Sequence, residues 1–104
     1  MDIFCKIVNN QIPSYTIYED AIVKVFLDVN PIHTGHTLIV PKKHYKDIFD
    51  IDEATINHIM KIAKRISSVL KEKLNYDGIT LCENNGYGQE IKHFHLHLIQ
   101  KYKN

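Results

Sequence analysis

The sequence predicts an α+β fold in which a five-stranded antiparallel sheet packs against one long helix, with a short helix at the N-terminus. The long helix is predicted because apolar side chains recur at helical spacing between Ile56 and Leu74. Five short segments rich in β-branched or alternating apolar residues predict the strands. Hairpin-like links between neighbouring strands favour an antiparallel sheet, and the helix would cover one of its faces.

The composition is that of a globular protein and excludes several classes. The chain has 104 residues, the size of one domain, and we expect a single domain over residues 1–104. Its hydrophobic content is 44%, its charged content is 24% and its net charge is +1, so we expect neither nucleic-acid nor membrane binding. Two cysteines make no disulfide framework, and no signal peptide or membrane span is expected. These features predict a cytoplasmic protein.

The predicted elements follow one another as helix, three strands, helix and two strands. The short helix spans 3–8. Its inward-facing residues are expected to be Ile3, Phe4 and Ile7. The long helix starts at a capping pattern in which Asp50 stands three residues before Glu53, and it ends near Leu74. Pro41 is expected to end the third strand. The strands are predicted over 16–19, 22–29, 36–40, 78–84 and 93–99.

Three histidines alternate with apolar residues in the stretch His93-Phe94-His95-Leu96-His97-Leu98-Ile99. A two-residue period is typical of a β-strand whose two faces differ. The apolar residues would point into the core, and the histidines would line the opposite face, with about 6.6 Å between successive Cβ atoms on that face. The stretch therefore predicts a wall of three imidazole rings.

Such a wall can be incidental, can bind a metal ion or can catalyse a reaction. Imidazoles two residues apart can share an ion. Imidazole is mostly neutral at pH 7, and therefore nucleophilic and basic, because its free pKa is near 6.5. Three rings can divide the work: one attacks, one orients the attacker and one transfers a proton. We favour catalysis, because three of the chain's 7 histidines fall within this short stretch.

Two further stretches are candidate ligand contacts. Asp28 lies at a strand end before Asn30-Pro31, where its carboxylate either accepts hydrogen bonds from a sugar diol or starts a turn. The loop over 84–90 contains two glycines, and its backbone N–H groups either hold an anion or form a plain hairpin turn. Its place directly before the three histidines favours the anion site. Cys82 has no base beside it in sequence and is expected to be a half-buried structural residue.

The stretch 93–99 resembles the signature of the histidine-triad (HIT) family, in which histidine and apolar residues alternate three times and two apolar residues follow. The similarity extends over nearly the whole chain and is to the Hint-like branch, which contains nucleoside phosphoramidases. The stretches that carry it are Ile3-Phe4-Cys5-Lys6-Ile7, Ile12-Pro13, Tyr18-Glu19-Asp20, Phe26-Leu27-Asp28-Val29-Asn30-Pro31 and the run from Gly35 to His44.

The resemblance implies a nucleotide hydrolase that acts on the α-phosphate of a purine nucleoside monophosphate derivative, such as a phosphoramidate. His95 would attack phosphorus and form a covalent nucleotidyl-histidine, from which water would release the nucleoside monophosphate. His93 would orient His95 through its carbonyl or its ring. His97 would bind the phosphate and assist the leaving group, with His36 beside them. Asp28 would bind the ribose hydroxyls.

The resemblance also implies which residues surround the base and the phosphate. The base pocket would be formed by Ile3, Phe4, Ile7, Phe26, Val29 and Leu38. The residues expected to approach the phosphate or the leaving group are Asn84, Gln89 and Glu90.

The chain departs from the family's pattern around the loop before the three histidines. The loop over 86–89 is two residues shorter than usual, and Glu90 stands where Ser or Thr is common. A carboxylate repels an anionic phosphate, so we expect Glu90 to be protonated, to turn away, to act as a proton donor or to contact a cationic leaving group. Gln100 replaces the usual proline after the signature.

No cofactor is expected to be required. Many bacterial members of the family bind zinc through a Cys-x-x-Cys segment and two histidines. The equivalent candidates here are Cys5, His44 and His93, but Asp2 stands at the other cysteine position, so zinc is not favoured. The family's homodimer, built across helix and sheet edges, is expected to be retained.

Two alternative functions stay open. The chain could hydrolyse dinucleoside polyphosphates, as in the Fhit-like branch of the family. It could also be a non-catalytic module that keeps the nucleotide pocket but has lost turnover through the shortened loop. Leaving-group preference distinguishes the first alternative, and nucleotide binding without turnover distinguishes the second.

Overall fold

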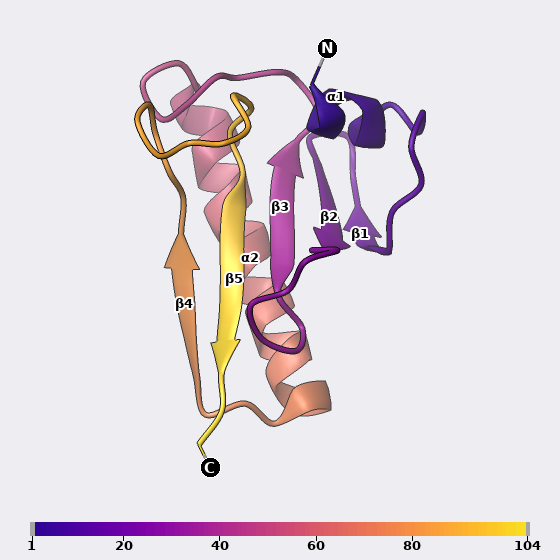
Figure 1. Cartoon of the computed structure of the whole chain (residues 1–104), viewed down its shortest axis with the longest axis vertical. Helices are drawn as coiled ribbons and strands as arrows, with labels where there is room; N and C mark the ends of the chain where they lie inside the picture. Colours follow the sequence, from indigo (N-terminus) through magenta and orange to yellow (C-terminus); the bar gives the residue numbers. More distant parts are fainter. Residues whose placement is uncertain (1, 104) are drawn as a thin grey trace.

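The computed structural model describes residues 2–103 and has the predicted α+β architecture (Figure 1). Its five strands form one antiparallel sheet in the order β1-β2-β3-β5-β4, with one long and one short helix. The elements are α1 (Ile3–Val8), β1 (Thr16–Glu19), β2 (Val23–Leu27), β3 (Thr37–Pro41), α2 (Glu53–Leu74), β4 (Gly78–Cys82) and β5 (Leu96–Lys101).

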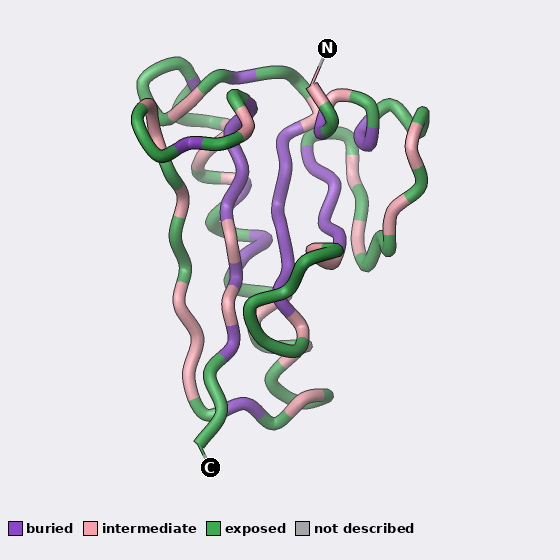
Figure 2. Tube along the Cα trace, in the orientation of Figure 1, coloured by how far each residue is buried: buried purple, intermediate pink, exposed green. Residues whose placement is uncertain are grey.

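Helix α2 covers one face of the sheet and lies behind it in Figure 1. Alternate residues of the strands point toward α2, because successive residues of a strand face opposite sides of the sheet. The core on this side includes Val23, Val25, Ile39, Leu96 and Leu98 from the strands and Ile59, Ile62 and Ala63 from α2. Figure 2 shows that β2 and β3 are buried along almost their whole length, so their other face is covered as well.

Helix α1 and its surroundings cover part of that second face. Its apolar side chains join a second core, which consists of Phe4, Ile7, Val8, Phe26, Leu38 and Val40. Lys24 is buried on this side, and its Nζ donates to the carbonyl of Ile7 at 3.2 Å and to Oδ1 of Asn10 at 2.7 Å. The carbonyl of Ile7 also accepts the N–H of Asn10 at 3.0 Å, and the bond from Lys24 ties this C-terminal end of α1 to β2.

The prediction that Asp50 starts the long helix is wrong. Asp52 is the N-cap of α2, and its Oδ1 accepts the N–H of Thr55 at 2.9 Å. Asp50 instead accepts the N–H of Lys46 at 2.8 Å, which closes the preceding loop. The C-terminal end is as predicted, because Asn75 adopts the left-handed conformation (φ 50°) that ends many helices. Neither helix described here has the length and apolar character needed to cross a membrane.

The observed strands differ from the predicted ones mainly at their ends. β5 begins at Leu96, not at His93, because the backbone just before it bonds elsewhere: the N–H of Phe94 donates to the carbonyl of Tyr45 at 2.7 Å. β2 and β4 are each shorter than predicted, and β3 includes Pro41 as its last residue. The alternation of apolar residues was therefore a sound guide to the strand itself but not to its start.

Two residues are more exposed than predicted. Cys82 is exposed because β4 is an edge strand of the sheet. Ile3 is 48% exposed and does not join the core beneath α1. Its position on the open side of α1 leaves it free to contact a ligand.

Candidate nucleotide site

A pocket of about 510 Å³ lies on the face of the sheet that carries α1, a usual size for a small-molecule site. Its walls come from α1, from β2 and β3, from β5 and from the loop that precedes β5. Most of the predicted site residues line it: Ile3, Phe4, Ile7, Phe26, Asp28, Val29, His36, Leu38, Asn84, Glu90, His95 and His97. Of the predicted residues, Gln89 and His93 lie outside this lining.

A backbone hydrogen bond fixes the tautomer of His95. Its Nδ1 lies 2.8 Å from the carbonyl oxygen of His93. Because a carbonyl can only accept, Nδ1 carries the proton and Nε2 keeps its lone pair. The ring is 8% exposed, and the ring of Phe4 packs edge-on against it with 4.8 Å between centroids. The carbonyl of His93, not its ring, therefore orients His95 in the pocket wall.

A second chain of hydrogen bonds fixes the tautomers of His36 and His97. The N–H of Ile32 donates to Nδ1 of His36 at 3.1 Å, so His36 carries its proton on Nε2. The Nε2–H of His36 donates to Nδ1 of His97 at 2.9 Å, so His97 carries its own proton on Nε2. Asp28 Oδ2 lies 3.6 Å from the same Nε2 of His36. The pocket thus contains one imidazole lone pair, on His95, and one imidazole N–H donor, on His97.

Burial keeps His36 and His97 neutral. It lowers the pKa of His97 to about 4, and the neighbouring rings of His95 and His36 act in the same direction. Burial also lowers the pKa of His36, although the carboxylate of Asp28 opposes this shift. At pH 7 these two rings therefore supply directed N–H groups and lone pairs and not positive charge.

The carboxylate of Asp28 combines the two roles that the sequence left open. Its Oδ1 accepts the N–H of Asn30 at 2.9 Å, which is the bond of a turn-forming aspartate. Its Oδ2 lies beside His36, and the side chain lines the pocket. One oxygen therefore holds the loop, and the other is placed to accept hydrogen bonds from a ligand.

Gln89 supports the loop before β5 and does not line the pocket. Its Oε1 accepts the N–H of Gly86 at 3.1 Å, and its Nε2 donates to the carbonyl of Lys46 at 2.6 Å. The side chain is 4% exposed. Glu90 differs, because it is exposed and lines the pocket. Gln89 thus supports the loop and lies outside the pocket lining, whereas a contact with the phosphate or the leaving group was expected for it.

Comparisons with known proteins decide the family. The sequence pattern of the HIT domain matches residues 9–104. This chain belongs to the HIT family. Adenosine 5'-monophosphoramidase HNT1 of Saccharomyces cerevisiae is 40% identical over 101 residues, which are 95% of this chain and 61% of that protein.

Solved structures of HIT proteins agree with this chain in fold. A HIT family protein from Bacillus anthracis matches with a TM-score of 0.94 and 42% identity, over 98% of this chain and 74% of that one. A zinc-bound histidine triad family protein from Mycobacterium smegmatis matches with a TM-score of 0.93 and 33% identity, over 98% of this chain and 76% of that one.

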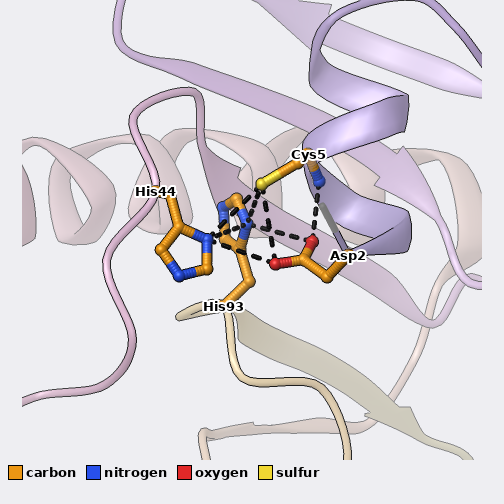
Figure 3. Close-up of side chains that lie close together, drawn as sticks. All are labelled: Asp2, Cys5, His44 and His93. Carbon is orange, nitrogen blue, oxygen red and sulfur yellow. Dashed lines mark hydrogen bonds and ion pairs between the residues drawn. The ribbon is translucent and has the colours of Figure 1, made fainter.

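This HIT chain has a second group of candidate ligands outside the pocket, which we call the N-terminal cluster (Figure 3). It consists of Asp2, Cys5, His44 and His93. Cys5 Sγ lies 3.4 Å from Nδ1 of His44, 3.4 Å from Nδ1 of His93 and 3.5 Å from Asp2 Oδ2. The two Nδ1 atoms are 3.3 Å apart, and the Asp2 carboxylate lies 3.2 Å from that of His44 and 3.3 Å from that of His93.

The ring of His93 does not share a wall with the other two histidines of the triad. It is fully buried in the N-terminal cluster, whereas His95 and His97 line the pocket. The strand period fails here because residues 93–95 precede β5. His93 still contributes to the pocket, but only through its backbone carbonyl.

Sequence reasoning missed the donor that sets the tautomer of His36. The N–H of Ile32 is a backbone group, so no residue type marks its role; the only signal is its place four residues before His36 in a loop. Several pocket residues were also missed, and they include Ser14, Asn30, Ile32, Ile91 and Ile99. They come from loops and from β5, and only the folded chain brings them together.

Proposed function

We propose that this HIT protein is a nucleotide-binding hydrolase that cleaves purine nucleoside phosphoramidates, or related adenylylated compounds, to a nucleoside monophosphate through a covalent nucleotidyl-histidine. The observation that carries the proposal is the 2.8 Å hydrogen bond from His95 Nδ1 to the carbonyl of His93, since it leaves Nε2 unprotonated at the pocket wall. Membership in the HIT family and the monophosphoramidase activity named for the yeast relative support it.

In the first step His95 Nε2 attacks the α-phosphorus. A P–Nε2 bond forms while the bond from phosphorus to the leaving amine breaks, and the amine takes the proton from Nε2 of His97. The N–H of His36, which faces Nδ1 of His97, stabilises the negative charge that develops on that ring. The neutral tautomers seen in the pocket are those that this step needs.

In the second step water attacks phosphorus and breaks the P–Nε2 bond. Its proton returns to Nε2 of His97, which restores the starting tautomers and releases the nucleoside monophosphate. A histidine nucleophile thus divides one displacement into two, and both use the same proton carrier. This chemistry requires no metal, and the zinc-candidate side chains of the N-terminal cluster lie outside the described pocket lining.

The rest of the pocket suits a nucleoside. Phe4, Ile7 and Leu38 supply buried apolar surface for a purine ring. The free carboxylate oxygen of Asp28 is placed to accept hydrogen bonds from ribose hydroxyls. Such an arrangement would orient the α-phosphate toward the two histidines.

Glu90 favours an amine as the leaving group over a polyphosphate. Its exposed carboxylate lines the pocket, where it would attract a cationic amine and repel the additional phosphates of a dinucleoside polyphosphate. Glu90, which stands where the family usually has Ser or Thr, therefore supports hydrolysis of phosphoramidates over hydrolysis of dinucleoside polyphosphates.

A substrate panel tests the proposal. The purified protein is incubated with an adenosine phosphoramidate that has a lysine leaving group and, separately, with a diadenosine polyphosphate, and AMP release is followed by chromatography. We expect faster release from the amidate. Faster cleavage of the polyphosphate would favour the alternative hydrolase, and AMP binding by calorimetry with no turnover would favour the non-catalytic module.

We further propose that the protein is a homodimer formed across α2 and the free edge of β4. β4 is an edge strand, and Leu81 on it is 38% exposed. On α2, Met60 and Val69 are 48% and 49% exposed. Light scattering after size exclusion is expected to give twice the 12.2 kDa of the chain, and a monomer at micromolar concentration would contradict this part of the proposal.

A further inference from the structure

The loop that joins β2 to β3 carries the donor on which the tautomers of the pocket depend. It includes residues 29–35, which form bends and a turn. The N–H of Ile32 donates to Nδ1 of His36 at 3.1 Å, and the Nε2–H of His36 donates to Nδ1 of His97 at 2.9 Å. The proton on His97 Nε2, which the proposed reaction transfers, therefore depends on where the loop holds one backbone N–H.

Loss of this N–H would permit the reverse arrangement of ring protons. A neutral imidazole has one proton, and its hydrogen-bond partners decide which nitrogen carries it. With its proton on Nδ1, His36 would turn a lone pair toward His97, and His97 would carry its own proton on Nδ1. Its Nε2 would then have no proton for a leaving amine. Asp28 Oδ2 favours the observed tautomer of His36, but at 3.6 Å it is too far away to make a hydrogen bond.

Two hydrogen bonds, which we call the loop clamp, tie the loop to the chain after the three histidines. The phenol of Tyr102 donates to the carbonyl of Thr34 at 2.7 Å. Nδ1 of His33 lies 2.5 Å from the carbonyl oxygen of Gln100, and the ring donates because a carbonyl can only accept. His33 and Thr34 directly follow Ile32. Both bonds of the loop clamp therefore act within two residues of the donor to His36.

The segment to which the loop is clamped is itself fixed to the rest of the fold. The N–H of Asp77 donates to the carbonyl of Lys101 at 2.8 Å, and the N–H of Lys103 donates to Oδ2 of Asp77 at 2.7 Å. Asp77 lies between α2 and β4, and Figure 1 shows the end of the chain beside this turn. The loop clamp thus joins an irregular loop to a segment that is held from its other side.

The packing of the loop against β5 does not hold it as well as the clamp does. Gly35 has a φ of 92°, and a Cβ on it would clash with Leu74 and lie 3.3 Å from Cδ of Gln100, so the loop backbone rests directly on these side chains. The Gln100 side chain is 0% exposed, and neither polar atom of its amide has a hydrogen-bond partner among the described residues. Burial of an unpaired amide costs free energy and opposes this packing. The observed position of the loop therefore depends on the clamp.

We propose that Tyr102 and His33 are positioning residues, which hold the loop so that the Ile32 N–H fixes the tautomers of His36 and His97. The consequence for catalysis rests on the proposed function, and the effect on the tautomers does not. The clamp determines where a proton lies on a neutral ring and not how much charge the ring carries. Because it acts through the proton that the leaving amine receives, its loss should lower kcat more than nucleotide affinity.

Nuclear magnetic resonance of the protein labelled with ¹⁵N-histidine tests the effect on the tautomers. Such spectra distinguish a ring nitrogen that carries a proton from one that has a lone pair, and in the parent we expect lone pairs on Nδ1 of His36 and of His97. Tyr102→Phe removes only a hydroxyl, and both signals should shift toward protonated nitrogen in this variant and further when His33→Ala is added. The matched control Tyr15→Phe, in a ring that is 76% exposed, should keep the parental spectrum. Parental signals in the double variant would overturn the proposal.

Steady-state hydrolysis of an adenosine phosphoramidate tests the consequence for catalysis. Tyr102 is 39% exposed and His33 is exposed, so both variants should fold, which thermal unfolding checks. We expect the double variant to lower kcat by about three- to tenfold, with AMP affinity, measured by calorimetry, changed by less than about twofold. Shifted tautomers with the parental kcat would overturn the catalytic part alone. Shifted tautomers in a protein whose parent has no turnover would overturn the proposed function and leave the loop clamp standing.

Discussion

The two histidine clusters of this protein use similar residues for different purposes. In the pocket, Asp28, His36 and His97 lie close enough together to share an ion. Hydrogen bonds nevertheless fix the ring protons, because the Ile32 N–H donates to His36 and the His36 N–H donates to His97. In the N-terminal cluster, Cys5 Sγ, the two imidazole Nδ1 atoms and the Asp2 carboxylate face one another at 3.2 to 3.5 Å. Donors and acceptors alternate in the pocket, as the proposed proton transfer requires, whereas the side chains of the N-terminal cluster contact one another outside the pocket lining.

The largest expected effect concerns the proposed nucleophile. His95→Ala removes this imidazole, so kcat for AMP release from an adenosine phosphoramidate should fall by about 10³-fold or more. Chromatography of the released AMP measures this rate. Turnover by His95→Ala at the parental rate would show that another group attacks phosphorus.

Acid should destabilise the protein through the pocket histidines. The pKa of His97 is about 4 in the folded protein and near 6.5 when unfolded, so protons bind preferentially to the unfolded chain. This contribution to stability is complete above pH 6.5 and decreases as the pH falls toward 4, by up to about 3 kcal/mol. Urea unfolding of the zinc-free protein across this range measures it, and His97→Gln should flatten the curve. A curve of equal slope in both proteins would contradict the burial argument.

Loss of the hydrogen bond between His36 and His97 should lower kcat less than loss of the proposed nucleophile, His95. His36→Ala leaves His97 free to adopt either tautomer, so we expect kcat to fall by about 10- to 100-fold, as for loss of a residue that orients a catalytic group. AMP affinity, measured by calorimetry, should change by less than about threefold. If both values fall together, His36 contributes to nucleotide binding and not to the orientation of His97.

The smallest effect concerns the N-terminal cluster. His44 is about half exposed at 48%, so His44→Ala should fold normally. We expect it to raise KM about threefold with kcat nearly unchanged, because only the packing beside α1 is weakened. Steady-state kinetics measures these values. A loss of kcat comparable with that of His95→Ala would mean that the two clusters do not act separately.

Local patterns predicted the secondary structure well, because the determinants are near one another in sequence. Apolar periodicity placed α2, and the β-branched segments placed the strands. Errors arose where two local options competed, as with Asp50 and Asp52: both precede the helix, but only Asp52 is free to cap it once Asp50 binds the N–H of Lys46. Such a choice depends on the path of the loop, which residue types do not specify.

The residues that line the pocket were predicted better than the arrangement of the three histidines. The alternation of residues 93–99 predicted three rings on one wall, but the ring of His93 lies in the N-terminal cluster because α1 and the segment around His44 approach it from distant parts of the chain. Gln89 was expected beside a phosphate, and its amide instead ties the loop to Lys46. Both errors have the same cause. A polar side chain can either bond to the surrounding protein or contact a ligand, and long-range packing decides between the two.

The two borders of the sheet are unlike, and this limits how copies of the protein can join. The pairing of β1 with β2 contains an irregularity between Thr16 and Tyr18, whereas β4 pairs with β5 residue by residue. An irregular border is a poor template for a further strand, and a regular one is a good template. A second copy of the protein can therefore extend the sheet at the β4 edge but not at the β1 edge. When two molecules pair through β4, the β4 edge of each molecule is occupied by the other. Neither molecule then offers a regular edge to a third, so the assembly stops at a dimer and does not grow into a fibre.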